Sequence, residues 1–172
     1  MKPYQAITLL PIIVVLIACA PPAYLQPSIE QGNIAYITVS NESLEDLSMA
    51  RYKKPASCEE PEWLLDDIFI KPKTERVVRF LGNELQTLLF TRGSRSSLNY
   101  KTDQLEWCYI AISFTPLKDD HFKFVAKSEL DKCVVQTFER NDLGHWFASN
   151  KMVKRKTDDF SFYENSPCGD EI

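Results

Sequence analysis

The sequence contains only two histidines and five glycines among its 172 residues. Neither residue stands in a recognised catalytic spacing: Gly-x-Ser-x-Gly, His-Glu-x-x-His and the glycine-rich phosphate loop are all absent from the sequence. The sequence also has no Cys-x-x-Cys pair, the spacing typical of structural zinc sites. We therefore predict that the protein is not an enzyme and holds neither a metal ion nor a cofactor.

The two histidines have ordinary structural interpretations. His121 follows Asp119-Asp120, where a turn enters a strand, and this pattern favours solvated turn residues. His145 lies between Gly144 and Trp146. We expect it in a loop that packs on aromatic residues rather than in the role of a general base.

A basic excess is also missing. The chain has 20 Lys and Arg against 24 Asp and Glu, which gives a net charge of −4 and argues against a nucleic-acid-binding protein. The hydrophobic share of 44% is typical of a folded globular chain rather than a disordered one. After residue 20 no apolar run approaches the length of about 20 residues that a membrane-spanning helix needs.

The first residues differ from the rest of the chain. Lys2 supplies a positive charge, and residues 7–18 are apolar and uncharged. This run is too short for a spanning helix and contains Pro11, but it has the layout of a secretory signal. We predict that residues 1–18 are a signal peptide.

The end of this run, Leu16-Ile17-Ala18-Cys19, resembles the lipobox of bacterial lipoproteins. The resemblance implies cleavage before Cys19, a diacylglyceryl group on its sulfur and acylation of the new amino group. Two or more chains anchor a protein stably. Because Ala20 stands where the inner-membrane retention signal has Asp, the resemblance implies the periplasmic face of the outer membrane.

Two alternatives to lipidation remain. Ala18-Cys19-Ala20 also fits the small-x-small pattern of ordinary signal cleavage, which would release a soluble periplasmic protein. That cut would leave Pro21 at the new terminus, where proline is poorly tolerated. The other alternative is an uncleaved anchor.

The mature chain divides into a tether and one domain. Residues 19–33 contain several prolines and few core-forming residues, so we predict a lipidated tether with a mean reach of about 20 Å. Residues 34–172 then form a single domain, a length sufficient for one hydrophobic core.

The domain is predicted to be all-β. Short β-type runs alternate with turn signals, as at residues 34–40, 48–54, 105–114, 121–127 and 132–139. Residues 75–81 and 84–91 flank Gly82-Asn83, which predicts a hairpin. Residues 62–68 fit one or two helical turns. Seven or eight such strands predict an antiparallel β-sandwich with Greek-key connections, immunoglobulin-like or transthyretin-like.

Cysteine usage fits an oxidising compartment. With Cys19 lipidated, an even number of cysteines remains, which predicts two disulfides with three connectivities open. If residues 105–139 form a three-stranded meander, Cys108 and Cys133 each lie near the start of their strand, at the same end of one sheet or of two facing sheets. This arrangement favours Cys108–Cys133 and leaves Cys58–Cys168.

One segment resembles a loose group of small β-sandwich lipoproteins of Gram-negative bacteria. Their pattern is a Cys-bearing strand ending in Phe-x-Pro, a turn, an aromatic strand and a second Cys, matched here from Cys108 through Phe114-Thr115-Pro116 to Cys133. The resemblance covers about forty residues, and the turn carries Asp119-Asp120 where the group has Gly. It implies a fold more than an activity.

Two sets of side chains are candidate binding residues. The basic residues near the end, Lys151, Lys154, Arg155 and Lys156, could meet anionic headgroups, although a solvated strand or loop is the simpler interpretation. The aromatic set could line a ligand groove or be covered by a loop. It comprises Trp107, Tyr109, Trp146 and Phe147.

Together these features predict a membrane-anchored, non-enzymatic binding or accessory module of the bacterial envelope. Its expected partners are the membrane, through the lipid on Cys19, and another envelope protein. The alternative is a periplasmic enzyme or enzyme inhibitor with an active loop that no motif identifies.

Overall fold

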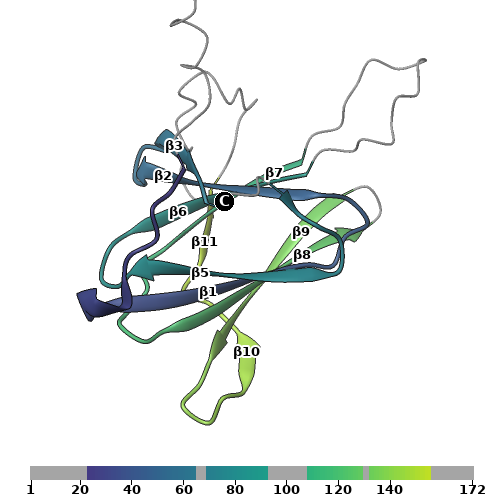
Figure 1. Ribbon diagram of the computed structural model, residues 1–172. Coiled ribbons are helices and arrows are strands. Elements are labelled where there is room, and N and C mark those ends of the chain that lie inside the picture. Colours follow the sequence, from purple (N-terminus) through teal and green to yellow (C-terminus); the bar gives the residue numbers. More distant parts are fainter. Residues whose placement is uncertain (1–22, 65–68, 93–107, 130–131, 156–172) are drawn as a thin grey trace, which may run out of the picture.

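The computed structural model describes residues 23–64, 69–92, 108–129 and 132–155. These residues form an all-β domain in which two sheets face each other (Figure 1). The predicted two-sheet, all-β architecture is confirmed. A three-residue 3₁₀ helix, η1 (Ile29–Gln31), precedes the first strand.

One sheet has five strands in the order β10-β9-β8-β1-β5. The strands are β1 (Ile34–Asn41), β5 (Thr74–Leu81), β8 (His121–Glu129), β9 (Lys132–Arg140) and β10 (Trp146–Ala148).

The other sheet has six strands. Five follow the order β11-β7-β6-β2-β3, and β4 pairs with β2 beside that path. The strands are β2 (Leu47–Lys54), β3 (Glu59–Trp63), β4 (Phe69–Ile70), β6 (Gln86–Arg92), β7 (Cys108–Phe114) and β11 (Val153–Arg155).

The predicted seven or eight strands are too few, since the described residues form eleven. The additional strands are short: β3, β4, β10 and β11 have two to five residues each. Such pieces are too short to show a clear alternation in the sequence, and only pairing with a longer neighbour makes them strands. The predicted helical turn is also wrong where the structure describes it, because Glu62 and Trp63 belong to β3; residues 65–68 lie outside the described residues.

Strand β2, predicted from residues 48–54, is an interior strand of its sheet. It pairs with β6 on one side and with β3 and β4 on the other. The arrangement is not purely antiparallel, because β1 and β8 pair in parallel. The chain crosses between the sheets several times between these two strands, so β8 can return in the direction of β1.

The predicted hairpin around Gly82 is wrong. Strand β5 belongs to the five-stranded sheet and β6 to the six-stranded sheet, so the turn carries the chain from one layer to the other. The Gly82 N–H donates to the Asn33 carbonyl and the Asn83 N–H to the Pro116 carbonyl. A Cβ on Gly82 would stand 2.9 Å from the backbone nitrogen of Lys118. The glycine therefore allows close packing between loops, which its sequence context does not distinguish from a hairpin turn.

The predicted meander is correct in its second half only. Strands β8 and β9 pair antiparallel, with Phe124 opposite Thr137. Strand β7 instead pairs with β6 and β11 in the facing sheet. The turn after Pro116 is therefore another crossing between layers, like the turn at Gly82.

The core lies between the sheets, and its residues recur along each strand with a period of two. Ile112 and Phe114 of β7 are buried against Phe122 and Phe124 of β8. The Phe114 ring lies 5.6 Å from the rings of both Phe122 and Phe124. Phe90 of β6 lies 5.3 Å from Phe124, which joins the two sheets at the same layer. These aromatic pairs fix how the two sheets face each other.

A second, smaller apolar cluster involves β2, β6 and β7. Ala50, Leu89 and Ala111 occupy positions adjacent to core residues along their strands, and so face away from the main core. Tyr52 and Cys58 complete the buried set, and Trp63 and Tyr109 pack beside it. The six-stranded sheet is therefore covered in part on its outer face.

Candidate binding site

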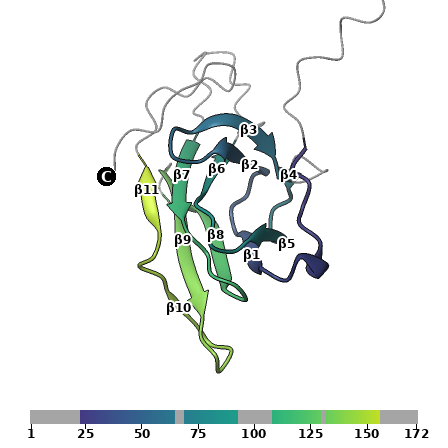
Figure 2. The ribbon, with the colours of Figure 1, turned by 90° about the vertical axis from the view of Figure 1, so that its left-hand side faces the viewer.

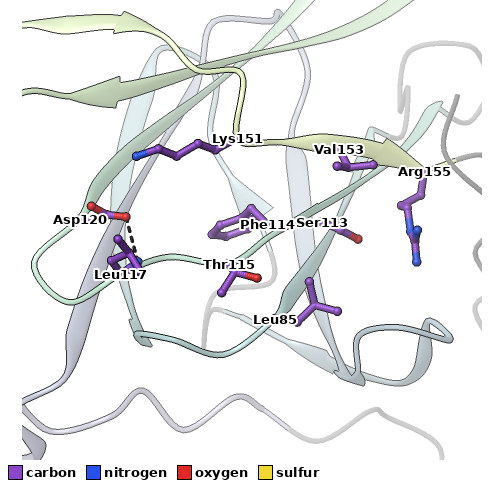
Figure 3. A pocket seen from close by; sticks show the side chains of 9 residues that line it. All are labelled: Leu85, Ser113, Phe114, Thr115, Leu117, Asp120, Lys151, Val153 and Arg155. Carbon is purple, nitrogen blue, oxygen red and sulfur yellow. Dashed lines mark hydrogen bonds between the residues drawn. The ribbon is translucent and has the colours of Figure 1, made fainter.

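A groove opens at the end of β7, between the turn that leads to β8 and the chain entering β11 (Figure 3). Its volume is about 470 Å³, within the usual range for small-molecule sites. Apolar side chains provide much of the wall. The lining residues are Leu85, Ser113, Phe114, Thr115, Leu117, Asp120, Lys151, Val153 and Arg155.

Most polar groups of the groove are bonded to the protein itself. Lys151 Nζ lies 3.0 Å from Glu139 Oε2, and Asp120 Oδ2 accepts the Leu117 N–H at 2.8 Å. The Ser113 hydroxyl lies 2.7 Å from the Thr87 hydroxyl. These bonds fix the shape of the groove and occupy part of its hydrogen-bonding capacity.

The four basic residues near the end of the chain do not all lie at the groove. Lys151 and Arg155 line the groove, whereas Lys154 is exposed and is not part of the lining. Arg155 donates to the Ala56 carbonyl at 3.2 Å, which ties β11 to the turn between β2 and β3. Lys156 lies outside the described residues. Two of these residues are therefore engaged in contacts within the protein, rather than forming a uniformly solvated strand.

The hairpin that joins β9 to β10 extends beyond the sandwich in both ribbon views (Figures 1 and 2). Its tip is internally bonded: the Gly144 N–H donates to the Asn141 carbonyl, and the Asn141 N–H to the His145 carbonyl. Gly144 has a φ of +83°, a conformation that favours glycine. Arg140 Nε also donates to the Gly144 carbonyl at 3.2 Å. The hairpin is thus a defined structure with its own framework.

This hairpin exposes three large apolar side chains. Leu143 is 81% exposed, Phe147 44% and Trp146 41%. Large apolar side chains gathered on one projecting element mark an interaction surface more than scattered ones do. We call Leu143, Trp146 and Phe147 the hairpin patch. Leu143 was missed in the sequence, although its position in Asn-Asp-Leu-Gly, between two β-type runs, signals a turn that exposes it.

The predicted aromatic set does not form one groove. Trp146 and Phe147 lie on the hairpin, whereas Tyr109 packs beside the outer cluster of the six-stranded sheet. Burial there raises the pKa of the Tyr109 phenol. Trp107 lies outside the described residues.

Part of the segment that was predicted to be a tether, residues 23–26, is bound to the domain. The Tyr24 N–H donates to the Trp63 carbonyl at 2.6 Å, and its hydroxyl donates to the Arg79 carbonyl at 3.1 Å. Gln26 Oε1 accepts the Arg79 N–H at 3.0 Å. Residues 23–26, which we call the strap, therefore bridge β3 of one sheet and β5 of the other. The single tyrosine gave no sequence signal for this docking.

The cysteines are described only in part. Cys58 is 2% exposed and disulfide-bonded. The backbones of Cys108 and Cys133 lie in β7 and β9, and Cys19 and Cys168 lie outside the described residues. The lipidation site and the disulfide partners stay predictions.

The histidines occupy structural positions. His121 begins β8 and stacks on Tyr36, with 4.8 Å between ring centroids. His145 stands at the hairpin tip, where its N–H donates to Asn141 Oδ1 at 2.9 Å. Within the described ranges, no cluster of three or more histidine, cysteine, aspartate or glutamate residues could hold a metal ion.

No protein-family model matches the chain, and no curated protein is similar to it in sequence. Among the described residues, no helix has the length and apolar character needed to cross a membrane.

Proposed function

We propose that the chain is the precursor of a bacterial lipoprotein that acts as a non-enzymatic binding or accessory module of the cell envelope. Cleavage before Cys19 and lipidation of its sulfur would hold the domain on the periplasmic face of the outer membrane. The charged start, the apolar run and the lipobox-like Leu16-Ile17-Ala18-Cys19 support the anchor. Ala20, at the position where the inner-membrane retention signal has Asp, supports location in the outer membrane.

The hairpin patch is the observation that carries the binding role. Exposed tryptophan, phenylalanine and leucine side chains stand on a hairpin held by its own hydrogen bonds. Aromatic side chains are enriched in protein interfaces because they bury a large area with few rotatable bonds. The proposed partner is another envelope protein that encloses the hairpin from both faces, because Trp146 and Phe147 are neighbours in β10 and their side chains point to opposite faces.

The proposed Cys108–Cys133 disulfide would link the two sheets across the core. Positions 108 and 133 stand two residues before Ile110 and Val135, which both contact the main core, so the strand period places them on inward-facing positions. Phe114 packs on Phe122 at the far end of β7, and β9 runs antiparallel to β8. The starts of β7 and β9 therefore lie at the same end of the two facing sheets.

The second proposed disulfide, Cys58–Cys168, is supported by the position of Cys58 in the apolar cluster on the outer face of the six-stranded sheet. Cys58 packs with Leu89 and Ala111 on the outer side of the six-stranded sheet, away from the inward series to which position 108 belongs. This placement disfavours Cys58–Cys108. With Cys19 lipidated and Cys108 paired to Cys133, Cys58 pairs with Cys168.

We also propose that the sandwich belongs to the Greek-key class, immunoglobulin-like or transthyretin-like. Support comes from the order in which the chain visits the layers. Strands β6 and β7 lie in one sheet, β8 to β10 in the other, and β11 returns to the first.

Photo-crosslinking in intact cells tests the binding role. The photoreactive residue benzoylphenylalanine is placed at Leu143, Phe147 or, as a control, Val77, which is 58% exposed on β5. We expect the same discrete protein adduct from positions 143 and 147 and none from position 77. In addition, Trp146→Ser should remove the adduct formed from position 143. Equal adducts from all three positions, or none, would contradict the proposal.

A further inference from the structure

Few residues separate the proposed lipidation site from the part of the chain that is bound to the domain. Hydrogen bonds hold it from Tyr24 onward, and Ala23 forms a bridge with Trp63. Only four peptide units separate Cys19 from Ala23, and a chain of that length spans at most about 14 Å. The link between the lipid and the bound strap is therefore much shorter than a tether of residues 19–33 would be.

We infer that the docked strap sets the orientation of the domain on the membrane, with the β2–β3 side against the lipid headgroups and the hairpin patch pointing away. This inference rests on the proposed lipidation of Cys19. A lipid chain attached through a long flexible tether would permit any orientation. A chain of about 14 Å cannot, because a domain of this size is about 35 Å across.

The ribbon views place the two ends of the domain accordingly. The described chain begins beside Trp63, at the end of β3 away from the turn that joins β3 to β2, and the β9–β10 hairpin projects on the opposite side of the domain (Figures 1 and 2). An attachment point at β3 therefore brings the β2–β3 side to the bilayer. The same attachment holds the hairpin patch roughly one domain length away, where a periplasmic partner reaches it.

The charges on the β2–β3 side suit a headgroup layer rich in phosphatidylethanolamine, which is zwitterionic. Lys54 Nζ lies 3.0 Å from Glu59 Oε2 and 2.7 Å from Glu60 Oε1. Glu62 Oε2 lies 3.0 Å from Arg51 Nε, and Glu62 Oε1 lies 3.2 Å from Lys53 Nζ. Within β2, β3 and the turn between them, three cations and three carboxylates thus balance. These described residues carry no charge excess that would repel an anionic component of the layer, and orientation by the strap should depend little on ionic strength.

Energy transfer on vesicles tests the orientation. The lipidated full-length product is isolated, its lipid on Cys19 is verified by mass spectrometry, and it is reconstituted into phosphatidylethanolamine–phosphatidylglycerol vesicles that carry a headgroup-labelled acceptor. A fluorescent amino acid is placed at Ala56, in the β2–β3 turn, or at Leu143, in the hairpin. Both side chains are exposed. Since the two positions differ by about a domain length of 35 Å, we expect transfer about twofold stronger or more from position 56.

Two further variants separate the strap from the lipid. Tyr24→Ala should release the strap and reduce the difference between the two positions, whereas Leu25→Ala, at a strap side chain that is 88% exposed, should preserve it. Inserting ten Gly and Ser residues after Ala20 lengthens the free chain without touching the strap, and should also reduce the difference.

Equal transfer from the two positions of the lipidated native chain, or stronger transfer from position 143, would overturn the orientation. An insertion variant that keeps the full difference would overturn the role of the short chain. Absence of lipid on Cys19 would instead contradict the proposed function, and mass spectrometry detects this before any transfer is measured.

Discussion

Tyr24 stacks on Phe80, with 5.3 Å between the ring centroids and 19° between the ring planes. The Arg51 guanidinium lies 4.2 Å from the centroid of the same tyrosine ring. Phe80 belongs to β5 of the five-stranded sheet, and Arg51 to β2 of the six-stranded sheet. One side chain of the strap therefore contacts both layers at the side of the sandwich where their edge strands meet.

Shortening this side chain should destabilise the domain. Tyr24→Ala removes the contacts with Phe80 and Arg51, and we expect a loss of about 2–3 kcal/mol in the free energy of unfolding, below the range for a fully buried aromatic because the ring is only half-buried. Tyr24→Phe keeps the ring and loses the interactions of the phenol oxygen, including the hydrogen bond to the Arg79 carbonyl, with an expected loss of about 1 kcal/mol. Urea unfolding of the mature domain measures both. Equal stability of Tyr24→Ala and the native protein would show that the strap does not stabilise the fold.

Replacement of Phe124 by alanine should lower the stability of the domain much more than the same replacement of Phe147. Phe124 is fully buried among Phe90, Phe114 and other core residues, so Phe124→Ala should cost about 3–5 kcal/mol. Phe147 is 44% exposed on the hairpin, and Phe147→Ala should cost less than about 1 kcal/mol. Thermal unfolding followed by circular dichroism compares the two. A large loss for Phe147→Ala would mean that the hairpin patch has a structural role rather than a binding one.

The sequence predicted individual strands better than their partners. In the sequence, Ile112 and Phe114 stand two residues apart, as do Phe122 and Phe124, and both pairs are inward-facing because a face that packs on a core must repeat every two residues. Gly82-Asn83 and Thr115-Pro116 signalled turns correctly, but a turn that returns to the same sheet and one that crosses to the facing sheet use the same residue types. Which strands pair is decided by contacts far apart in sequence, such as the parallel pairing of β1 with β8.

The sequence likewise predicted the candidate binding residues better than their positions relative to one another. Trp146 and Phe147 were recognised as candidate binding residues, but the sequence could not separate them from Tyr109, which packs beside the outer cluster. The role of Tyr24 could not be predicted either. Its partners Trp63 and Arg79 are about 40 and 55 residues away in the chain, and no local pattern in a proline-rich segment indicates them.

The domain should lose stability in alkaline solution. Burial raises the pKa of Tyr24 to about 12, against about 10 for an unfolded tyrosine, and burial also raises the pKa of Tyr52. The folded state thus holds the phenol protons more tightly than the unfolded state. This contribution to stability is fully present below about pH 10 and is lost as the pH rises from there toward 12. Urea midpoints measured from pH 8 to 12 should fall over this interval.

The Tyr24→Phe variant provides the control for this pH dependence. Phenylalanine does not ionise, so the variant should be less stable at pH 8 and should lose less stability than the native protein between pH 10 and 12. Phenolate absorbance at 295 nm should show one fewer late-titrating tyrosine. A pH dependence identical to that of the native protein would assign the alkaline loss to other groups.

The last prediction concerns the two disulfides. In the chain-entropy account, a bridge across the loop from Cys108 to Cys133 contributes about 3 kcal/mol, and the longer Cys58–Cys168 loop about 5 kcal/mol. Each is a large part of a typical total stability of about 5–15 kcal/mol. Non-reducing peptide mapping of the mature protein should therefore recover the pairs 108–133 and 58–168. Cys58→Ser should lower stability and leave Cys168 reactive toward a thiol reagent while the 108–133 peptide pair remains. Recovery of a 58–108 pair would contradict the inward placement of position 108, and four free thiols in protein isolated from the envelope would contradict export to an oxidising compartment.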